Sequence, residues 1–103
     1  MSVEKILREA IQARAPVSLC YESTGSAPRT VHPHVLFRTS TGKICIDGYQ
    51  VDGATSSGER IPDWRQMNLA KITQVELLDE EFDTAAGLNL ASPKYSNGLL
   101  AHV

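Results

Sequence analysis

The chain has 103 residues, a formal net charge of −2, 42% apolar residues and 21% charged residues, which is typical of one soluble globular domain. This composition favours neither disorder nor a coiled coil, and the net charge argues against a general polyanion binder. The charge is uneven, because residues 29–71 carry six basic side chains against four acidic ones, while the flanks carry four against eight. A local anion site in the middle of the chain is therefore favoured over a broad basic face.

The two cysteines, Cys20 and Cys45, fall inside expected strands and lack a C-x-x-C spacing. Buried reduced thiols in a cytoplasmic protein are the favoured interpretation, and a disulfide between adjacent strands is the minor alternative. The first residues include Glu4 and Glu9, and no apolar run is long enough for a signal peptide or a membrane span. We therefore expect a cytoplasmic location and no membrane partner.

An amphipathic helix is predicted over residues 2–14. Its apolar side chains recur at the spacing of one helix face: Val3, Ile6, Leu7, Ala10 and Ile11. Ser2 can cap the first turn, and Pro16 disfavours helical geometry at Ala15. The apolar stripe indicates that the helix covers an end or a face of the sheet.

Five strands follow, separated by turn-forming segments. They are predicted at residues 17–22, 29–38, 43–51, 64–69 and 71–78, with a longer loop at 52–62 and an acidic cluster at 79–83. Pro33 inside the second strand indicates an edge or a bulge, because proline cannot donate to a ladder. A helix followed by short strands favours an α+β fold with a small curled sheet or barrel.

Side-chain alternation assigns the faces of the second strand. It places Val31, Val35 and Phe37 with Pro33 on one face, and His32, His34, Leu36 and Arg38 on the other. Residues 84–103 are too apolar for a simple disordered tail. We therefore expect residues 1–83 to form the helix and barrel, and residues 84–103 to form an extension that docks on the barrel or on a second subunit.

An antiparallel meander brings several polar and aromatic residues to one rim. The second and fourth strands then start at the same end, beside the 52–62 loop. The residues expected at this rim are Tyr21, Arg29, Tyr49 and Arg65. Arg29 and Arg65 share parity with the core residues of their strands, so both are expected to point across the open mouth.

Two sequence segments resemble WYL domains. Tyr21, Gly25 and the run Arg29-x-Val31-x-Pro33 resemble the opening of these domains, and the run from Arg65 to Ile72 resembles their later R-x-F-x-L-x-R-I segment. Val75, Leu78 and Phe82 continue the pattern, so the resemblance spans about residues 4–82. The eponymous Trp-Tyr-Leu is replaced by Ile44-Cys45-Ile46, which removes two groups that stack on bases.

The resemblance implies an SH3- or Sm-like five-stranded barrel behind the N-terminal helix, and a sensor of nucleotide or nucleic-acid ligands in bacterial transcription regulation. It assigns anion contacts to Arg29 and Arg65, and a weaker role to Lys71, which the meander places at the opposite end. We expect non-catalytic binding of a nucleotide or single-stranded nucleic acid, with Tyr21 and Tyr49 at the same rim. The alternative is a protein-interaction module, such as a homodimer formed through residues 84–103.

Catalytic and metal sites are not favoured by the sequence. Cys20 with His32 or His34 is conceivable as a nucleophile and base, but a cysteine in mid-strand fits a core better than a catalytic setting. His32 and His34 lie on one strand face with acceptable metal-ligand geometry, yet only His102 remains as a third imidazole. We therefore expect no enzyme activity, no cofactor and no metal.

Overall fold

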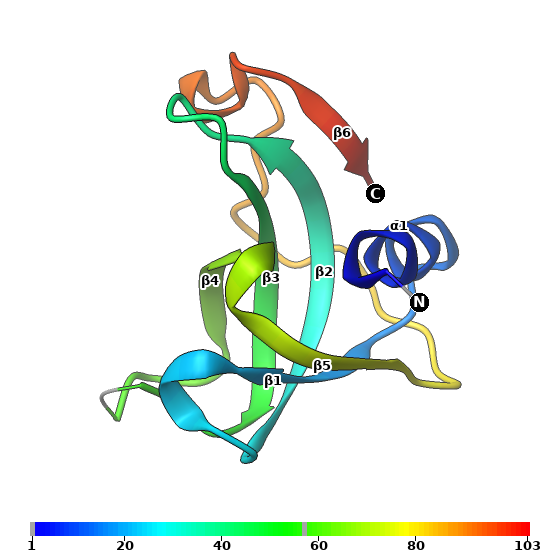
Figure 1. The fold of residues 1–103 in the computed structure, drawn as a ribbon. Coiled ribbons are helices and arrows are strands. Elements are labelled where there is room, and N and C mark those ends of the chain that lie inside the picture. The colour runs from blue at the N-terminus through cyan, green and yellow to red at the C-terminus, as the bar shows by residue number, and fades with distance from the viewer. Residues whose placement is uncertain (1, 57) are drawn as a thin grey trace.

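A computed structural model describes residues 2–56 and 58–103, which form an α+β fold with one N-terminal helix and one antiparallel sheet of six strands (Figure 1). The elements are α1 (Val3–Ala13), β1 (Val17–Tyr21), β2 (Pro28–Arg38), β3 (Ile44–Gly53), β4 (Asp63–Asn68), β5 (Ile72–Leu77) and β6 (Leu99–His102). Three short 3-10 helices join them: η1 (Glu22–Thr24), η2 (Leu69–Lys71) and η3 (Pro93–Tyr95). The predicted helix and five predicted strands are confirmed, with ends within two residues of those expected.

Helix α1 begins and ends as its sequence indicates. The Ser2 hydroxyl accepts a hydrogen bond from the Lys5 backbone N–H at 3.0 Å, and Arg14 closes the helix in a left-handed conformation at φ 51°. Leu7, Ala10 and Ile11 are buried. The helix therefore turns its apolar face onto the sheet, where it packs against β2, β5 and β6.

The strands are hydrogen-bonded in the order β4-β3-β2-β1-β5, and β6 pairs with β2 beside this path. The first half of β2 pairs with β1 and its second half pairs with β6, while β3 runs along most of its length. In Figure 1 the long β2 and β3 stand upright, and β1 and β5 run across their lower part. Among the described residues β4 and β5 lie at opposite ends of the pairing path, so the sheet bends without closing.

A bulge in β2 overturns part of the predicted alternation. The register with β3 shifts between Pro33 and Val35, so the extra residue His34 reverses the faces of the residues that follow it. Leu36, expected opposite Val31, joins Val31 in one apolar cluster, whereas Val35 and Phe37 face the other way. The bulge that Pro33 indicated is present. Strict alternation of side chains does not hold across a bulge, so the predicted faces are wrong for the residues after it.

The sheet is consequently buried on both faces. The first apolar cluster lies between α1 and the inner face of the bent sheet and includes Leu7, Ile11, Val17, Leu19, Val31, Leu36, Ile46 and Met67. The second lies on the outer face and consists of Val35, Phe37, Cys45 and Tyr95, with Leu88 and Leu90 packed against it. Fully buried residues thus occupy both sides of β2 and β3.

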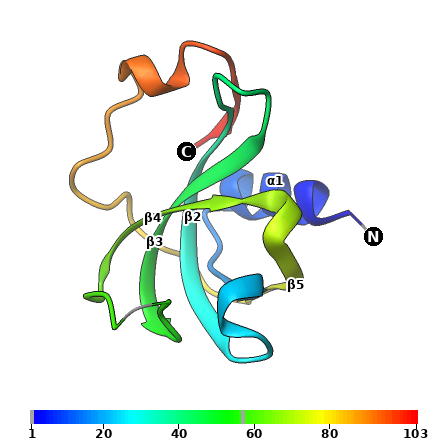
Figure 2. The ribbon, with the colours of Figure 1, turned by 60° about the vertical axis from the view of Figure 1, so that its left-hand side comes forward.

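Residues 84–103 form a covering segment that serves both faces: Leu88, Leu90 and Tyr95 lie on the outer cluster, and Leu100, Ala101 and Val103 on the inner one. The loop after β5 leads into this segment, which turns at η3 and returns as β6 beside β2 (Figures 1 and 2). Backbone hydrogen bonds from Arg38 N–H to Gly98 O and from Val103 N–H to His34 O, both at 3.0 Å, tie this return to β2. Pairing with β2 accounts for a sixth strand that the sequence interpretation did not include.

Candidate functional site

Arg29 lies at the start of β2, buried beneath two loops with 3% of its surface exposed. Its guanidinium donates to the Thr24, Ser23 and Ser56 hydroxyls and to the Gln50 amide oxygen. The contact with Ser56 is 3.0 Å, and the other four hydrogen bonds lie between 3.2 and 3.4 Å. The bond to Ser23 is at the upper limit of the usual N–H···O length, and the other three exceed it.

No carboxylate oxygen lies within 4.0 Å of the Arg29 guanidinium among the described residues. Burial lowers the pKa of Arg29, and Glu59 opposes that effect only from a longer distance. The guanidinium also lies over the Tyr21 ring, 5.3 Å from its centroid. Arg29 is therefore a buried cation satisfied by neutral groups and an aromatic face.

Arg65 sits on β4 opposite Gly48 of β3, whereas Arg29 lies opposite Gly53 at the end of β3. Its Nε lies 3.9 Å from Glu59 Oε1, its Nη1 lies 3.8 Å from Asp63 Oδ2, and its other donors bond the backbone oxygens of Trp64 and Arg60. Buried Nε makes no hydrogen bond to the described residues. Because two acids flank it, Arg65 adds less net positive charge to the rim than its identity suggests.

The two arginines are joined by a chain of polar contacts. Arg29 donates to the Ser56 hydroxyl, the Ser56 N–H donates to Glu59 Oε1 at 3.2 Å, and the same carboxylate oxygen faces Arg65. The Ser23 and Ser56 hydroxyls also meet at 2.7 Å. We call Arg29, Gln50, Ser23, Thr24 and Ser56 the arginine cluster.

Of the remaining predicted site residues, Tyr21 lies beside Arg29, whereas Tyr49 and Lys71 lie elsewhere on the sheet. Tyr21 contacts Arg29 and accepts a hydrogen bond from the Asn68 N–H at 3.1 Å. Tyr49 pairs with Trp64, 5.5 Å between ring centroids, on the opposite sheet face from Gln50. Lys71 is exposed at the end of η2, which follows β4. It lines a surface depression that Tyr21 also lines.

The two histidines are involved in packing rather than in a ligand set. His32 stacks on Phe82 with ring centroids 4.8 Å apart, and His34 lies edge-on to Trp64 at the same distance. The Ala85 N–H donates to His34 Nε2 at 3.0 Å, so His34 Nδ1–H donates to the His32 carbonyl at 2.6 Å. In residues 2–56 and 58–103 no group of three or more His, Cys, Asp or Glu side chains is arranged to hold a metal ion.

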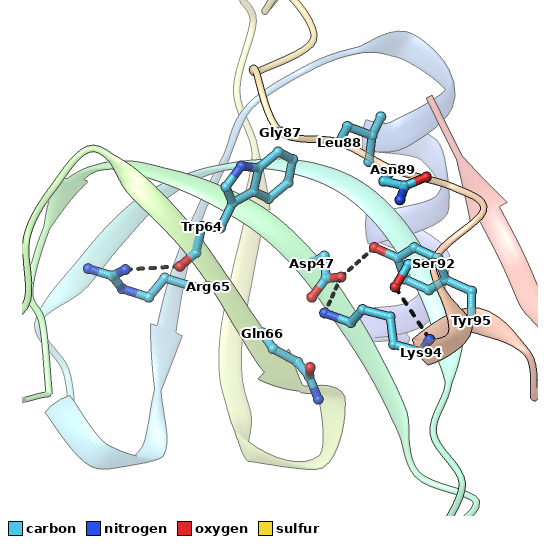
Figure 3. A pocket seen from close by; sticks show the side chains of 10 residues that line it. All are labelled: Asp47, Trp64, Arg65, Gln66, Gly87, Leu88, Asn89, Ser92, Lys94 and Tyr95. Carbon is cyan, nitrogen blue, oxygen red and sulfur yellow. Dashed lines mark hydrogen bonds and ion pairs between the residues drawn. The ribbon is translucent and has the colours of Figure 1, made fainter.

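A second recess lies between the outer face of the sheet and the covering segment. This cleft encloses about 350 Å³ and is lined by Asp47, Trp64, Arg65, Gln66, Gly87, Leu88, Asn89, Ser92, Lys94 and Tyr95. Figure 3 shows Asp47 at its centre and the Arg65 side chain turned away toward the Trp64 carbonyl. We call this recess the Asp47 cleft.

Asp47 is the most buried charged side chain in the cleft, with 9% of its side chain exposed. The Tyr95 hydroxyl donates to its Oδ2 at 2.6 Å, and Lys94 Nζ lies 2.8 Å from the same oxygen. Burial and the bond to Asp47 raise the pKa of Tyr95, so its hydroxyl stays protonated and donating. Both contacts join the covering segment to β3.

Sequence reasoning missed Asp47, Lys94 and Tyr95. A signal for Asp47 was present, since a carboxylate in the otherwise buried run Ile44–Tyr49 needs a partner. No signal identified the partners, because they lie more than forty residues further along the chain.

Searches with the sequence found no matching protein-family model and no significant match among curated proteins. In the described residues, no helix combines the length and the apolar character that crossing a membrane requires.

Proposed function

We propose that the protein is a non-catalytic sensing domain that binds the anionic group of a nucleotide-class ligand at Arg29. The observation that supports this is a guanidinium buried to 3% exposure without a carboxylate within 4.0 Å among the described residues. A phosphate accepts two parallel, charge-assisted hydrogen bonds from such a fork. It therefore replaces long bonds to neutral hydroxyls with shorter and stronger ones.

The resemblance to WYL domains supports the same ligand class and an SH3- or Sm-like description of the bent sheet. The route to Arg29 passes between the loop that holds Ser23 and the loop that holds Ser56. These loops meet through a hydroxyl contact of 2.7 Å, and Ser56 is exposed. Parting them uncovers the guanidinium without disturbing a strand.

The charge around Arg29 favours one small anion over a nucleic-acid track. Arg65 is flanked by Glu59 and Asp63, so Arg29 is the cation in this cluster without a carboxylate within ion-pair distance. A mononucleotide needs one such contact, whereas a bound strand needs several phosphate contacts. Ligand affinity should therefore fall with salt with a slope close to that of a single phosphate contact.

A thermal-shift titration tests the proposal, with adenosine monophosphate, inorganic phosphate and a short oligothymidylate at low and high salt. We expect the mononucleotide to raise the melting temperature and Arg29→Lys, which loses the planar fork, to abolish the rise. Arg38→Lys, at the exposed far end of β2, is the matched control and should keep it. An equal shift in the Arg29→Lys variant, or no shift with any of the three compounds, would contradict anion binding at Arg29.

Ser56→Ala separates a ligand site from a loop clamp. It removes the shortest hydrogen bond of the Arg29 guanidinium while leaving the arginine in place. If the guanidinium receives an anion, the variant should bind the mononucleotide at least as tightly as the parent chain. A loss of stability together with a loss of the ligand shift would assign Arg29 to holding the loops.

The rival role, assembly through residues 84–103, has no comparable observation behind it. Of the apolar side chains in this segment, Leu88 and Leu90 pack on the outer cluster and Leu100 and Val103 on the inner one, while Leu99 is exposed. Ligand sensing is therefore the proposal that a specific feature of the molecule supports.

A further inference from the structure

The Asp47 cleft contains an acceptor that the fold does not use. Both internal contacts of the Asp47 carboxylate go to Oδ2, and no described residue donates a hydrogen bond to Oδ1. The side chain is nine-tenths buried, and Oδ1 is not among the buried polar atoms that lack a partner. Since Asp47 lines the cleft, Oδ1 has its remaining access there. A donor entering the cleft therefore meets a prepared carboxylate oxygen.

A cation lies beside this acceptor. Lys94 Nζ is 2.8 Å from Asp47 Oδ2, and 42% of the Lys94 side chain is exposed. An ammonium group has three donors, and one is directed at Asp47. Lys94 can therefore hold an acceptor of an incoming molecule without releasing Asp47 (Figure 3).

The charge balance restricts the ligand. Asp47 and Lys94 neutralise each other, and the Arg65 side chain points away and faces Glu59 and Asp63. The cleft therefore has no net charge with which to attract a ligand that is only positive or only negative. A molecule with one positive and one negative pole, however, finds a partner for each.

The spacing of the two partners restricts the ligand further. Because the Asp47 carboxylate and the Lys94 ammonium are in direct contact, the free acceptor oxygen of one lies close to the free N–H donors of the other. The matching poles of the ligand must also be close, as they are when an amino group and a carboxylate share one carbon. The Trp64 ring and Leu88 supply apolar wall for a side chain, while Gln66 and Asn89 add amide groups. The volume of about 350 Å³ is at the small end of ligand pockets.

We propose that the Asp47 cleft binds a free α-amino acid, with its ammonium on Asp47 Oδ1 and its carboxylate on Lys94 Nζ. This site is separate from the arginine cluster, since it lies on the opposite face of the sheet. It requires no covalent step. The covering segment supplies Lys94 and the sheet supplies Asp47, so a bound amino acid also ties the segment to the sheet.

The test uses the full chain labelled with ¹⁵N and titrated with glycine, L-leucine, L-glutamine and L-phenylalanine. Trp64 is the single tryptophan, so its indole N–H signal reports on the cleft without ambiguity. We expect a saturable shift of this signal with at least one amino acid, at a Kd of about 1 mM or tighter. No saturable shift up to about ten times that concentration with any of the four would overturn the proposal.

Derivatives and variants assign the two poles. The N-acetyl and the C-terminal amide derivatives of the bound amino acid each lose one charge, and each should bind about tenfold more weakly. Lys94→Gln should weaken the parent amino acid by a similar factor, while Lys5→Gln, an exposed lysine on α1, should not. Lys94 is half exposed, so this variant should keep the dispersed spectrum of the folded chain. Equal binding of either derivative, or unchanged binding to Lys94→Gln, would overturn the assignment.

Discussion

Four buried polar side chains on the sheet each hold a loop in place. Arg29 bonds the loops at 22–26 and 54–59, Gln50 donates to the Ala54 carbonyl at 2.7 Å, His34 accepts from the Ala85 N–H, and Asp47 accepts from Tyr95. A buried polar group must find a hydrogen-bond partner, and loops offer backbone and hydroxyl groups that strands have already used. At the scale of the residue, these side chains therefore fix the loop positions that apolar packing leaves undetermined.

Neutral His34 should make stability depend on pH. Burial lowers the pKa of His34 in the folded chain below its ordinary value of 6.5. Between the folded pKa and 6.5 the unfolded chain binds the extra proton, so the free energy of unfolding is at its full value above pH 6.5 and falls as the pH drops below it. Urea unfolding at a series of pH values from 8 to 5 measures this slope.

The assignment of that slope to His34 is checked with His34→Gln. Its amide oxygen can still accept from the Ala85 N–H, but the side chain does not titrate. The variant should show a shallower pH dependence than the parent, with the remaining slope due in part to His32, whose pKa is also lowered by burial. An identical slope in the two chains would exclude His34 as the titrating group.

Tyr95→Phe should be more destabilising than loss of the neighbouring charge. The Tyr95 hydroxyl donates to a buried carboxylate at 2.6 Å, and hydrogen bonds to charged groups contribute about 1.5–3 kcal/mol. Lys94→Gln removes a half-exposed ion pair with Asp47, for which we expect at most about 1 kcal/mol. Urea unfolding of both variants at pH 7 compares them, and a larger loss for Lys94→Gln would contradict this ranking.

At the scale of the element, local pattern predicted the helix and five strands because periodicity and turn residues act over short distances. The apolar spacing of α1 and the turn segments around β2 set their ends within two residues. The same pattern failed at His34, because a bulge is a pairing event between two strands and leaves no periodic signature in one. It also missed β6, a four-residue strand that exists by pairing with β2.

Local pattern also predicted only part of the candidate site. Antiparallel order started β2 and β4 at the same end, but the expectation that Arg29 and Arg65 both point across an open mouth was wrong, because Ser23 and Ser56 close over Arg29 and Arg65 turns to backbone oxygens. Loop positions depend on tertiary contacts between distant segments. The Asp47 cleft depends on residues of the covering segment and was therefore outside the reach of local reasoning.

Gly48 in β3 allows β2 and β3 to pack closely beneath the bulge. A Cβ at this position would overlap Cγ1 of Val31, a fully buried residue of the inner cluster. Gly48→Ala should therefore destabilise the chain by about 1–3 kcal/mol, the usual cost of overpacking. Equilibrium unfolding in urea measures the loss.

A double-mutant cycle tests the cause. Val31→Ala removes the clashing methyl, so Gly48→Ala should cost less in that background than in the parent chain, with a coupling of about 0.5 kcal/mol or more. Val35→Ala lies on the other face of the same strand and serves as the control. Additive effects with Val31→Ala would show that the loss arises elsewhere than at this contact.

At the scale of the whole molecule, one sheet separates two apolar clusters with different covers. Helix α1 covers the inner face together with side chains of β6, and the segment before β6 covers the outer face with Leu88, Leu90 and Tyr95. The inner cluster is larger; its buried residues all precede position 73, and Leu100, Ala101 and Val103 of the C-terminal segment pack against its margin. The outer cluster needs Tyr95 to bury Phe37 and Cys45. The two faces should therefore differ in how they depend on the C-terminal segment.

The two cysteines supply one thiol inside the outer cluster, Cys45, and one outside both clusters, Cys20. Cys20 lies on β1 with 7% exposure, and Cys45 lies in the outer cluster with 3% exposure. Burial also raises the pKa of Cys45, which disfavours its reactive thiolate. In the full chain at pH 7, both thiols should react slowly with iodoacetamide, and mass spectrometry after digestion measures each rate separately.

A chain ending at residue 83 should react selectively at Cys45. The truncation removes Leu88, Leu90 and Tyr95 from above that thiol, while Cys20 retains β2 and β5 as neighbours on either side. We expect the Cys45 rate to rise well above the Cys20 rate, with the helical circular-dichroism signal of α1 retained. Equal acceleration at both cysteines would mean that the truncated chain unfolds as a unit, so that the inner cluster depends on residues 84–103, including the β6 side chains that pack against it. An unchanged Cys45 rate would mean instead that the sheet itself, and not residues 84–103, shields the outer cluster.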